Sequence, residues 1–190
     1  LEKDAGEPVI GKSSLPYGDF FSFHTSLKEI GLGRGFSIHK VHLGDYTLKM
    51  GQGLVAWNGF SLRGETNPYG VFKRGETITP YTSSDENNFL RGGAVTLRKE
   101  NKKFKRVETT LFYSLKKVDA RIKDGVYTSL PKDGLHNTES LAQTRKTLGE
   151  LVYGGSISFK TKNFNVGANY LGYGYDAHNG RQVAEYNRYQ

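Results

Sequence analysis

The sequence contains no cysteine and only one methionine and one tryptophan. Without cysteine, a disulfide or a thiolate metal site is impossible. Long hydrophobic runs are also missing, and since only 36% of the residues are hydrophobic, no membrane-spanning helix is expected. A transmembrane β-barrel remains compatible with this composition, because only alternate residues of a membrane-crossing strand need to be apolar.

The abundant residues are 24 glycines, 12 tyrosines and 11 phenylalanines. This composition is typical of β proteins, both outer-membrane barrels and soluble ones. The length of 190 residues allows one unit with a core, so we expect a single partial barrel segment over residues 1–190.

The formal net charge is +8, and its one dense basic run lies at residues 98–106. Such a surplus is able to bind nucleic acid or anionic lipid. The run coincides with a predicted turn, and we interpret it as a solvated turn. We therefore expect no nucleic-acid partner through this segment.

Strict alternation between apolar and polar residues indicates strands, because successive side chains of a strand point to opposite faces. The hairpin at residues 151–175 is the plainest case, with Leu151, Tyr153, Ile157 and Phe159 on one face of its first arm. Each arm has about the 9–11 residues that a tilted strand needs to cross a bilayer. The strands we expect lie near residues 20–28, 36–50, 90–99, 104–122, 151–160 and 164–175. The alternation slips near residues 40–41, which predicts a bulge.

The connections between these strands alternate in length. Short turns at 29–35, 100–103 and 161–163 are separated by long loops at 51–89 and 123–150. In an up-and-down meander all the short turns then lie at one end of the sheet and both long loops at the other. Outer-membrane barrels have this asymmetry, with short periplasmic turns and long extracellular loops.

The second long loop also contains a helix signal. Ser140 with Gln143 resembles a capping box, and Gly149 is suited to end a helix of about two turns. The predicted fold class is therefore all-β: an antiparallel up-and-down meander, part of a transmembrane β-barrel, with a short helix in one long loop. Since the smallest single-chain barrels have eight strands and six are visible, we expect a piece of a larger barrel.

Candidate binding residues come from the polar face of the strands and from one loop. Arg106, Glu108 and Lys116 share a face of the fourth strand, and Asn165 and Asn169 share the corresponding face of the sixth. In a barrel they line the lumen, where they steer a solute or pair with a plug; a purely structural charge ladder is the alternative. Trp57 follows the second strand, where an aromatic girdle, a loop folded over the lumen or simple local packing would use it.

The sequence gives little support for a catalytic, nucleotide-binding or metal site. No Ser-His-Asp arrangement is evident, the Gly-x-Gly strings complete no phosphate-binding pattern, and His39 and His42 are spaced to point to opposite faces of a strand. We expect no catalysis, no metal and no cofactor.

Several glycine-aromatic motifs resemble one family in their order and spacing. The longest is LGDYTLKMGQGLVAWNGF at residues 43–60, and shorter matches lie at 80–83, 91–94, 112–114, 128–130, 136–139 and 153–155. Together they resemble Bacteroidetes envelope proteins of the helix-hairpin-helix-domain-containing family. The resemblance implies an internal slice of a longer bacterial outer-membrane barrel, bordered by lipid, by the remaining strands and by other envelope proteins.

Two functions stay open from the sequence. The first is a structural, transport or docking role as an outer-membrane barrel segment. The second is a soluble β-barrel or sandwich that binds a ligand, such as a glycan, through Tyr, Trp and Asn side chains.

Overall fold

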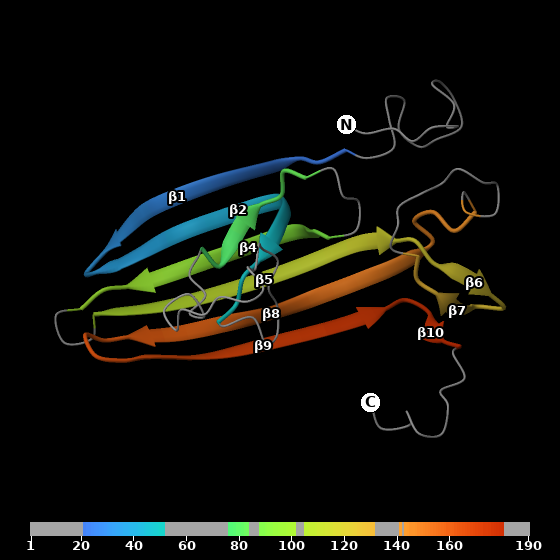
Figure 1. The fold of residues 1–190 in the computed structure, drawn as a ribbon. Helices are drawn as coiled ribbons and strands as arrows, with labels where there is room; N and C mark the ends of the chain where they lie inside the picture. Colours follow the sequence, from blue (N-terminus) through green and yellow to red (C-terminus); the bar gives the residue numbers. More distant parts are fainter. Residues whose placement is uncertain are drawn as a thin grey trace, which may run out of the picture.

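The computed structural model of the chain describes residues 21–51, 76–83, 88–101, 105–131, 141 and 143–180, and nearly all its regular structure is β (Figure 1). The strands are β1 (His24–Gly33), β2 (Phe36–Leu48), β3 (Ile78–Pro80), β4 (Leu90–Lys99), β5 (Arg106–Val118), β6 (Arg121–Lys123), β7 (Val126–Ser129), β8 (Leu148–Lys160), β9 (Asn165–Tyr175) and β10 (His178–Asn179).

The six long strands form one antiparallel sheet in the order β1-β2-β4-β5-β8-β9, and β3 pairs with β2 outside this path. The predicted all-β, up-and-down meander is confirmed. The turns β1–β2, β4–β5 and β8–β9 lie at one end of the sheet, and a small sheet of order β10-β7-β6 lies next to the other end (Figure 1). Among the described residues the barrel is not closed, since β1 and β9 each have one long neighbour.

The two faces of the sheet differ sharply in burial. On β5, Thr110, Phe112 and Ser114 are buried, whereas Leu111 and Tyr113 between them are each 53% exposed. We call the side of Phe112 the covered face and the side of Leu111 the bare face. The cross-strand register carries this division over the sheet, as Leu111 pairs with Val95 and Gly155. Large side chains exposed on the bare face are Leu27, Leu43, Leu97, Leu111, Tyr113, Leu115, Tyr153, Ile157, Phe159, Val166 and Tyr170.

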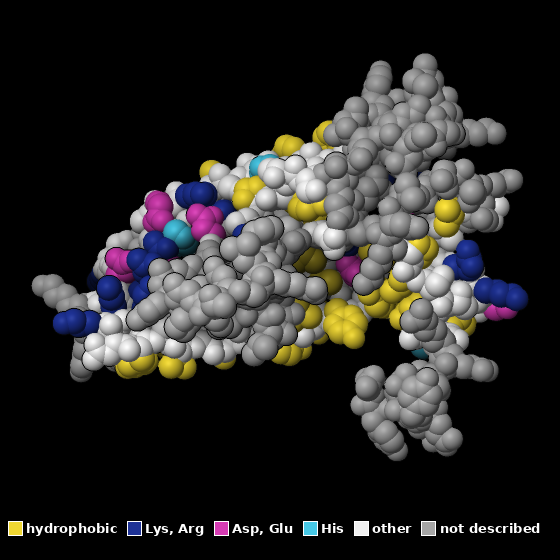
Figure 2. Space-filling view, in the orientation of Figure 1, with side chains coloured by type: hydrophobic (Ala, Val, Ile, Leu, Met, Phe, Trp, Pro, Cys, Tyr) yellow, Lys and Arg dark blue, Asp and Glu magenta, His cyan; other side chains and the backbone are white. Residues whose placement is uncertain are grey.

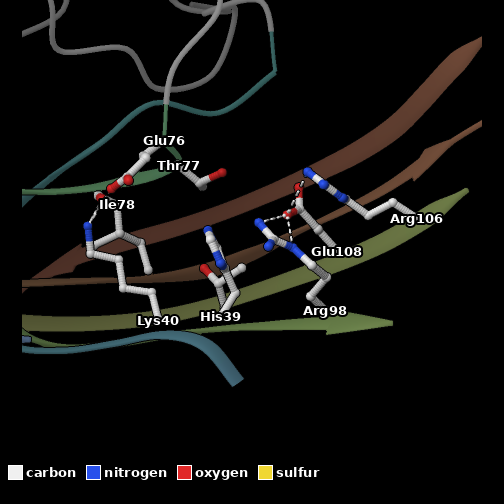
Figure 3. A pocket seen from close by; sticks show the side chains of 9 residues that line it. His39, Lys40, Glu76, Thr77, Ile78, Arg98, Arg106 and Glu108 are labelled. Atoms are coloured by element: carbon white, nitrogen blue, oxygen red, sulfur yellow. Dashed lines mark hydrogen bonds and ion pairs between the residues drawn. The ribbon is translucent and has the colours of Figure 1, made fainter. Parts of the chain in front are cut away.

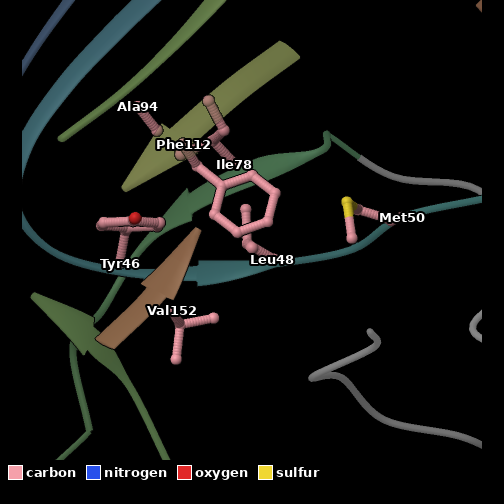
Figure 4. Packing of buried hydrophobic residues seen from close by; sticks show 7 residues of the cluster. All are labelled: Tyr46, Leu48, Met50, Ile78, Ala94, Phe112 and Val152. Atoms are coloured by element: carbon pink, nitrogen blue, oxygen red, sulfur yellow. The ribbon is translucent and has the colours of Figure 1, made fainter. Parts of the chain in front are cut away.

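The core lies on the covered face, where β3 folds back over the sheet. β2 leaves β4 at Tyr46 and continues along β3, pairing Tyr46 with Pro80 and Leu48 with Ile78. Figure 4 shows Phe112 pointing between these segments. The cluster consists of Tyr46, Leu48, Met50, Ile78, Ala94, Phe112 and Val152.

Strand boundaries differ from the prediction at two places. The expected turn at 29–35 shrinks to Arg34 and Gly35, both with positive φ (51° and 78°), because β1 continues to Gly33. The expected strand 104–122 divides into β5 and the short β6, and the two long loops hold β3 and β7. The predicted bulge is present one to two residues earlier, as a register shift between Ile38 and Lys40 opposite β4.

The predicted helix of about two turns before Gly149 is not seen among the described residues, of which only Leu141 is helical. Residues 143–146 form a turn, and β8 already begins at Leu148, with Gly149 paired to Lys117. The backbone around this turn bonds to a distant segment instead: Lys146 N donates to Asp119 Oδ1, and Ala120 N donates to the Thr144 carbonyl. These long-range bonds compete with a helical ladder. Ser140 lies outside the described residues.

We expect Phe112→Ala to lower the free energy of unfolding by about 3 kcal/mol, because it leaves a cavity among the buried residues around β3. Denaturant titration measures this loss in the free energy of unfolding. Leu111→Ala is the matched control, since the neighbouring Leu111 points to the bare face and leaves no cavity. An equal loss for both variants would contradict the assignment of the core.

Candidate functional site

A cavity of about 230 Å³ opens on the covered face, in the half of the sheet nearer the short turns. It lies between β3 and the ends of β2, β4 and β5, and Figure 3 shows charged side chains from these strands facing one another. Figure 2 shows acidic and basic side chains gathered over this part of the molecule. The ionisable residues lining the cavity are His39, Lys40, Glu76, Arg98, Arg106 and Glu108.

One wall of the cavity is a cross-strand ladder of charges. Arg98 on β4 stands opposite Glu108 on β5, and its Nη2 and Nε atoms both lie 2.8 Å from Glu108 Oε1. Arg106 Nη1 approaches the same oxygen at 3.8 Å, and Arg106 Nη2 lies 3.3 Å from Glu100 Oε1. Because Arg98 is 14% exposed and contacts the carboxylate through two nitrogens, its position is well defined.

The opposite wall is held by a buried lysine. Lys40, 3% exposed, donates from Nζ to Glu76 Oε2 at 2.6 Å and to the Ile78 carbonyl at 2.8 Å. A buried ammonium needs such partners, since an unpaired one carries a large desolvation cost. Lys40 therefore ties the β3 segment to the sheet.

At the mouth of the cavity the β1 strand adds a further carboxylate. Glu29 Oε1 lies 2.5 Å from His39 Nδ1 and 3.4 Å from Arg98 Nη1. Glu29 is 59% exposed, so these contacts face solvent and contribute little to stability. Taken together, positive and negative groups alternate around the cavity, which suits it to polar solutes or to a polar segment of protein.

The structure brings together only some of the candidate residues. Arg106 and Glu108 both line the cavity. Lys116 lies at the other end of β5, where its Nζ bonds the Phe89 carbonyl at 2.8 Å and approaches Glu150 at 3.8 Å. Asn165 and Asn169 pair with Lys160 and Ser156 on the same covered face. Trp57 lies outside the described residues.

Sequence reasoning missed Lys40, Glu76 and Arg98. The prediction of a solvated basic turn at 98–106 includes Arg98, although the two-residue alternation of β4 separates Arg98 from Lys99 and puts it on the face of Glu108. Nothing in the sequence signals the contact of Lys40 with Glu76, because the two residues are 36 positions apart and belong to different elements.

A second polar cluster lies under β1. His42 is fully buried; its Nε2 donates to the Asp45 carbonyl at 3.0 Å, which leaves Nδ1 to accept from Ser26 Oγ at 2.6 Å. The Asp45 carboxylate turns away from the histidine and binds Arg91, with Oδ1 2.7 Å from Nε. The histidine and the aspartate side chain therefore belong to separate contacts, and Asp45 provides no acid partner for a Ser-His pair.

Comparison of the chain with protein family models, curated proteins and solved structures finds no match. Within the described ranges, no group of three or more His, Cys, Asp or Glu residues is placed to hold a metal ion. No helix in those ranges is long and apolar enough to cross a membrane.

Replacing Lys40 by methionine should loosen the β3 segment. The change leaves the Ile78 carbonyl without its donor, and we expect the free energy of unfolding to fall by about 1–3 kcal/mol. Limited proteolysis and denaturant titration measure the effect. Lys28→Met is the control, because Lys28 is 54% exposed and its Nζ is 3.6 Å from Glu76 Oε1, a longer and more solvated contact. This change should lower the free energy of unfolding by less than about 0.5 kcal/mol.

The cavity also predicts a pH dependence. The hydrogen bond from Lys40 lowers the pKa of the Glu76 carboxyl below its ordinary value, and the positive charges of Lys40 and Lys28 act in the same direction against the opposing effect of burial. The stabilisation is therefore present above the unfolded pKa of about 4.3 and is lost as the pH falls through the lower folded value. Denaturant midpoints should drop on acidification below that range, and Glu76→Gln should reduce the drop; an unchanged drop would contradict the role of Glu76.

Proposed function

We propose that this chain forms part of the wall of a transmembrane β-barrel in a bacterial outer membrane, with a structural, transport or docking role and without catalysis. The observation that carries the proposal is the bare face. Leucine, isoleucine, valine and aromatic side chains cover it, and many of them are 40–60% exposed. Most of the charged and polar side chains of the long strands lie on the covered face instead.

Exposed apolar side chains on one face and charged side chains on the covered face are the reverse of the arrangement that water favours. A soluble protein rarely leaves contiguous apolar patches larger than a few hundred Å² uncovered. In a membrane barrel the apolar residues face lipid and the interior is polar, with a loop often folded inside. The β3 segment, held on the polar side by Lys40, corresponds to such an inward loop.

The height of the apolar surface also agrees with a bilayer. On β5, the residues of the bare face are bounded by Lys105, which precedes the strand, and by Lys117 near its end. The bare-face residues between these two lysines are uncharged. Those residues are Val107, Thr109, Leu111, Tyr113 and Leu115. At about 3.3 Å per residue and a tilt of about 45°, the 12 steps from Lys105 to Lys117 rise about 28 Å, close to the hydrocarbon thickness of about 30 Å.

The open edges fit the same proposal. β1 and β9 each have unpaired backbone groups along one side among the described residues, and such groups are costly in lipid. The wall therefore needs further strands at both edges, from the rest of a longer barrel. The family resemblance of the glycine-aromatic motifs is consistent with this partner, and outer-membrane lipid covers the bare face.

The remaining alternative is a soluble β domain that binds a ligand such as a glycan. It requires another layer of protein over the bare face, and the described residues supply no such layer. Cell fractionation separates the two proposals. After alkaline washing of the source membranes, an outer-membrane protein stays in the pellet until detergent is added, whereas recovery of the protein in plain buffer would overturn the barrel proposal.

A charge in the middle of the bare face tests the proposal at one residue. We expect Leu111→Arg to cost about 2–4 kcal/mol of folding free energy in lipid vesicles, the usual penalty for arginine near the bilayer midplane. Ser158→Arg is the matched control, since Ser158 stands opposite Glu108 on the covered face, which in the proposed barrel borders the polar interior and not lipid. Urea titration of vesicle-inserted protein gives both values; similar penalties for the two would count against lipid contact.

A further inference from the structure

The short-turn end of the sheet carries a cluster of exposed cations. We call the basic rim the set Arg34, Lys99, Lys105 and Lys162. They come from all three turns, so they form a row along one end of the wall and not a local run in the sequence (Figure 1). Figure 2 shows several of the dark blue side chains at this end.

No member of the basic rim forms an ion pair within the part of the chain that the structure describes. The nearby acids are already engaged: Glu100 pairs with Arg106, Glu108 with Arg98, and Glu29 with His39. The rim therefore keeps its positive charge. The long-loop end differs, because there Asp119, Asp124, Glu150 and Asp176 are interspersed among the cations.

The rim borders the bare face directly. Lys99 holds its Nζ 4.3 Å from the centre of the Phe36 ring, and Phe36 is 46% exposed. Lys162 in the β8–β9 turn lies between Phe159 and Phe164 in the sequence, and these two rings are 44% and 59% exposed. Lysines beside exposed aromatic rings at the edge of an apolar surface are placed for the boundary between hydrocarbon and headgroups.

We propose that the basic rim binds the phosphates of anionic phospholipid headgroups and so fixes the depth of this end of the wall in the bilayer. The inference rests on the proposed barrel function and adds a lipid preference to it. Charge complementarity identifies the partner: exposed, unpaired ammonium and guanidinium groups at headgroup level attract anionic lipid, and the attraction weakens with salt.

The test uses the full-length protein diluted from detergent into vesicles, with association measured by co-flotation. The vesicles are phosphatidylcholine alone, or phosphatidylcholine and phosphatidylglycerol in equal parts, at low and at high salt. We expect tighter association with the anionic vesicles at low salt and a loss of that preference at high salt. In the triple variant Lys99→Gln, Lys105→Gln, Lys162→Gln, we expect the preference for anionic vesicles over phosphatidylcholine vesicles to fall about five-fold for each charge removed.

The matched control is Lys117→Gln, Arg121→Gln, Lys123→Gln, which removes the same charge at the long-loop end. Arg121 and Lys123 belong to β6, in the small sheet beyond the end of the main one (Figure 1). The control should keep most of the preference for anionic vesicles. Equal losses for both triples, or no preference in the unaltered protein, would overturn the inference. Failure to associate with pure phosphatidylcholine vesicles would instead overturn the barrel proposal, so the two failures are distinguishable.

Discussion

The structure depends on the two-residue period of the β-strand. Because each strand presents alternate residues to opposite sides, one row of apolar and one row of polar residues on each strand are enough to give the sheet two chemically different faces. The register then aligns the rows: Leu111 meets Val95 and Gly155, and Thr110 meets Thr96 and Ser156. The β3 segment and the charged cavity both lie on the polar side of that division.

Charge on the covered face is tolerated because it is internally neutralised. Lys40 and Arg98 are almost buried, and each has a carboxylate within hydrogen-bonding distance. These pairs stabilise less by their net energy than by the geometry they impose, since desolvation offsets much of the attraction. Their positions decide where the β3 segment lies and how β4 and β5 are aligned, which defines the shape of the cavity between them.

The long strands and their order follow from local patterns, and the sequence predicts them well. The alternation in 90–99 and 151–160 is strict, and it can be recognised within each strand without knowledge of its contacts to distant segments. The failures have a common physical origin in long-range contacts. The Ser140–Gln143 signal predicted a helix, but Asp119 and Ala120 bond the backbone of that turn and it continues into β8. The sequence predicts one wall of the cavity, because Arg106 and Glu108 lie on the same face of one strand. It does not predict the other wall, because Lys40 and Glu76 meet only after β3 folds back over the sheet.

The uninterrupted order of the meander has a consequence for how such a wall is built and how it changes. Every long strand pairs with its nearest long neighbour in sequence, so each hairpin can add to the edge left by the preceding one without threading through completed structure. Gain or loss of one hairpin leaves the remaining strands with the same direction and the same bare face. The sheet is therefore modular in units of two strands. In the proposed barrel, the circumference would then vary with the number of hairpins while the membrane fixes the height of the wall.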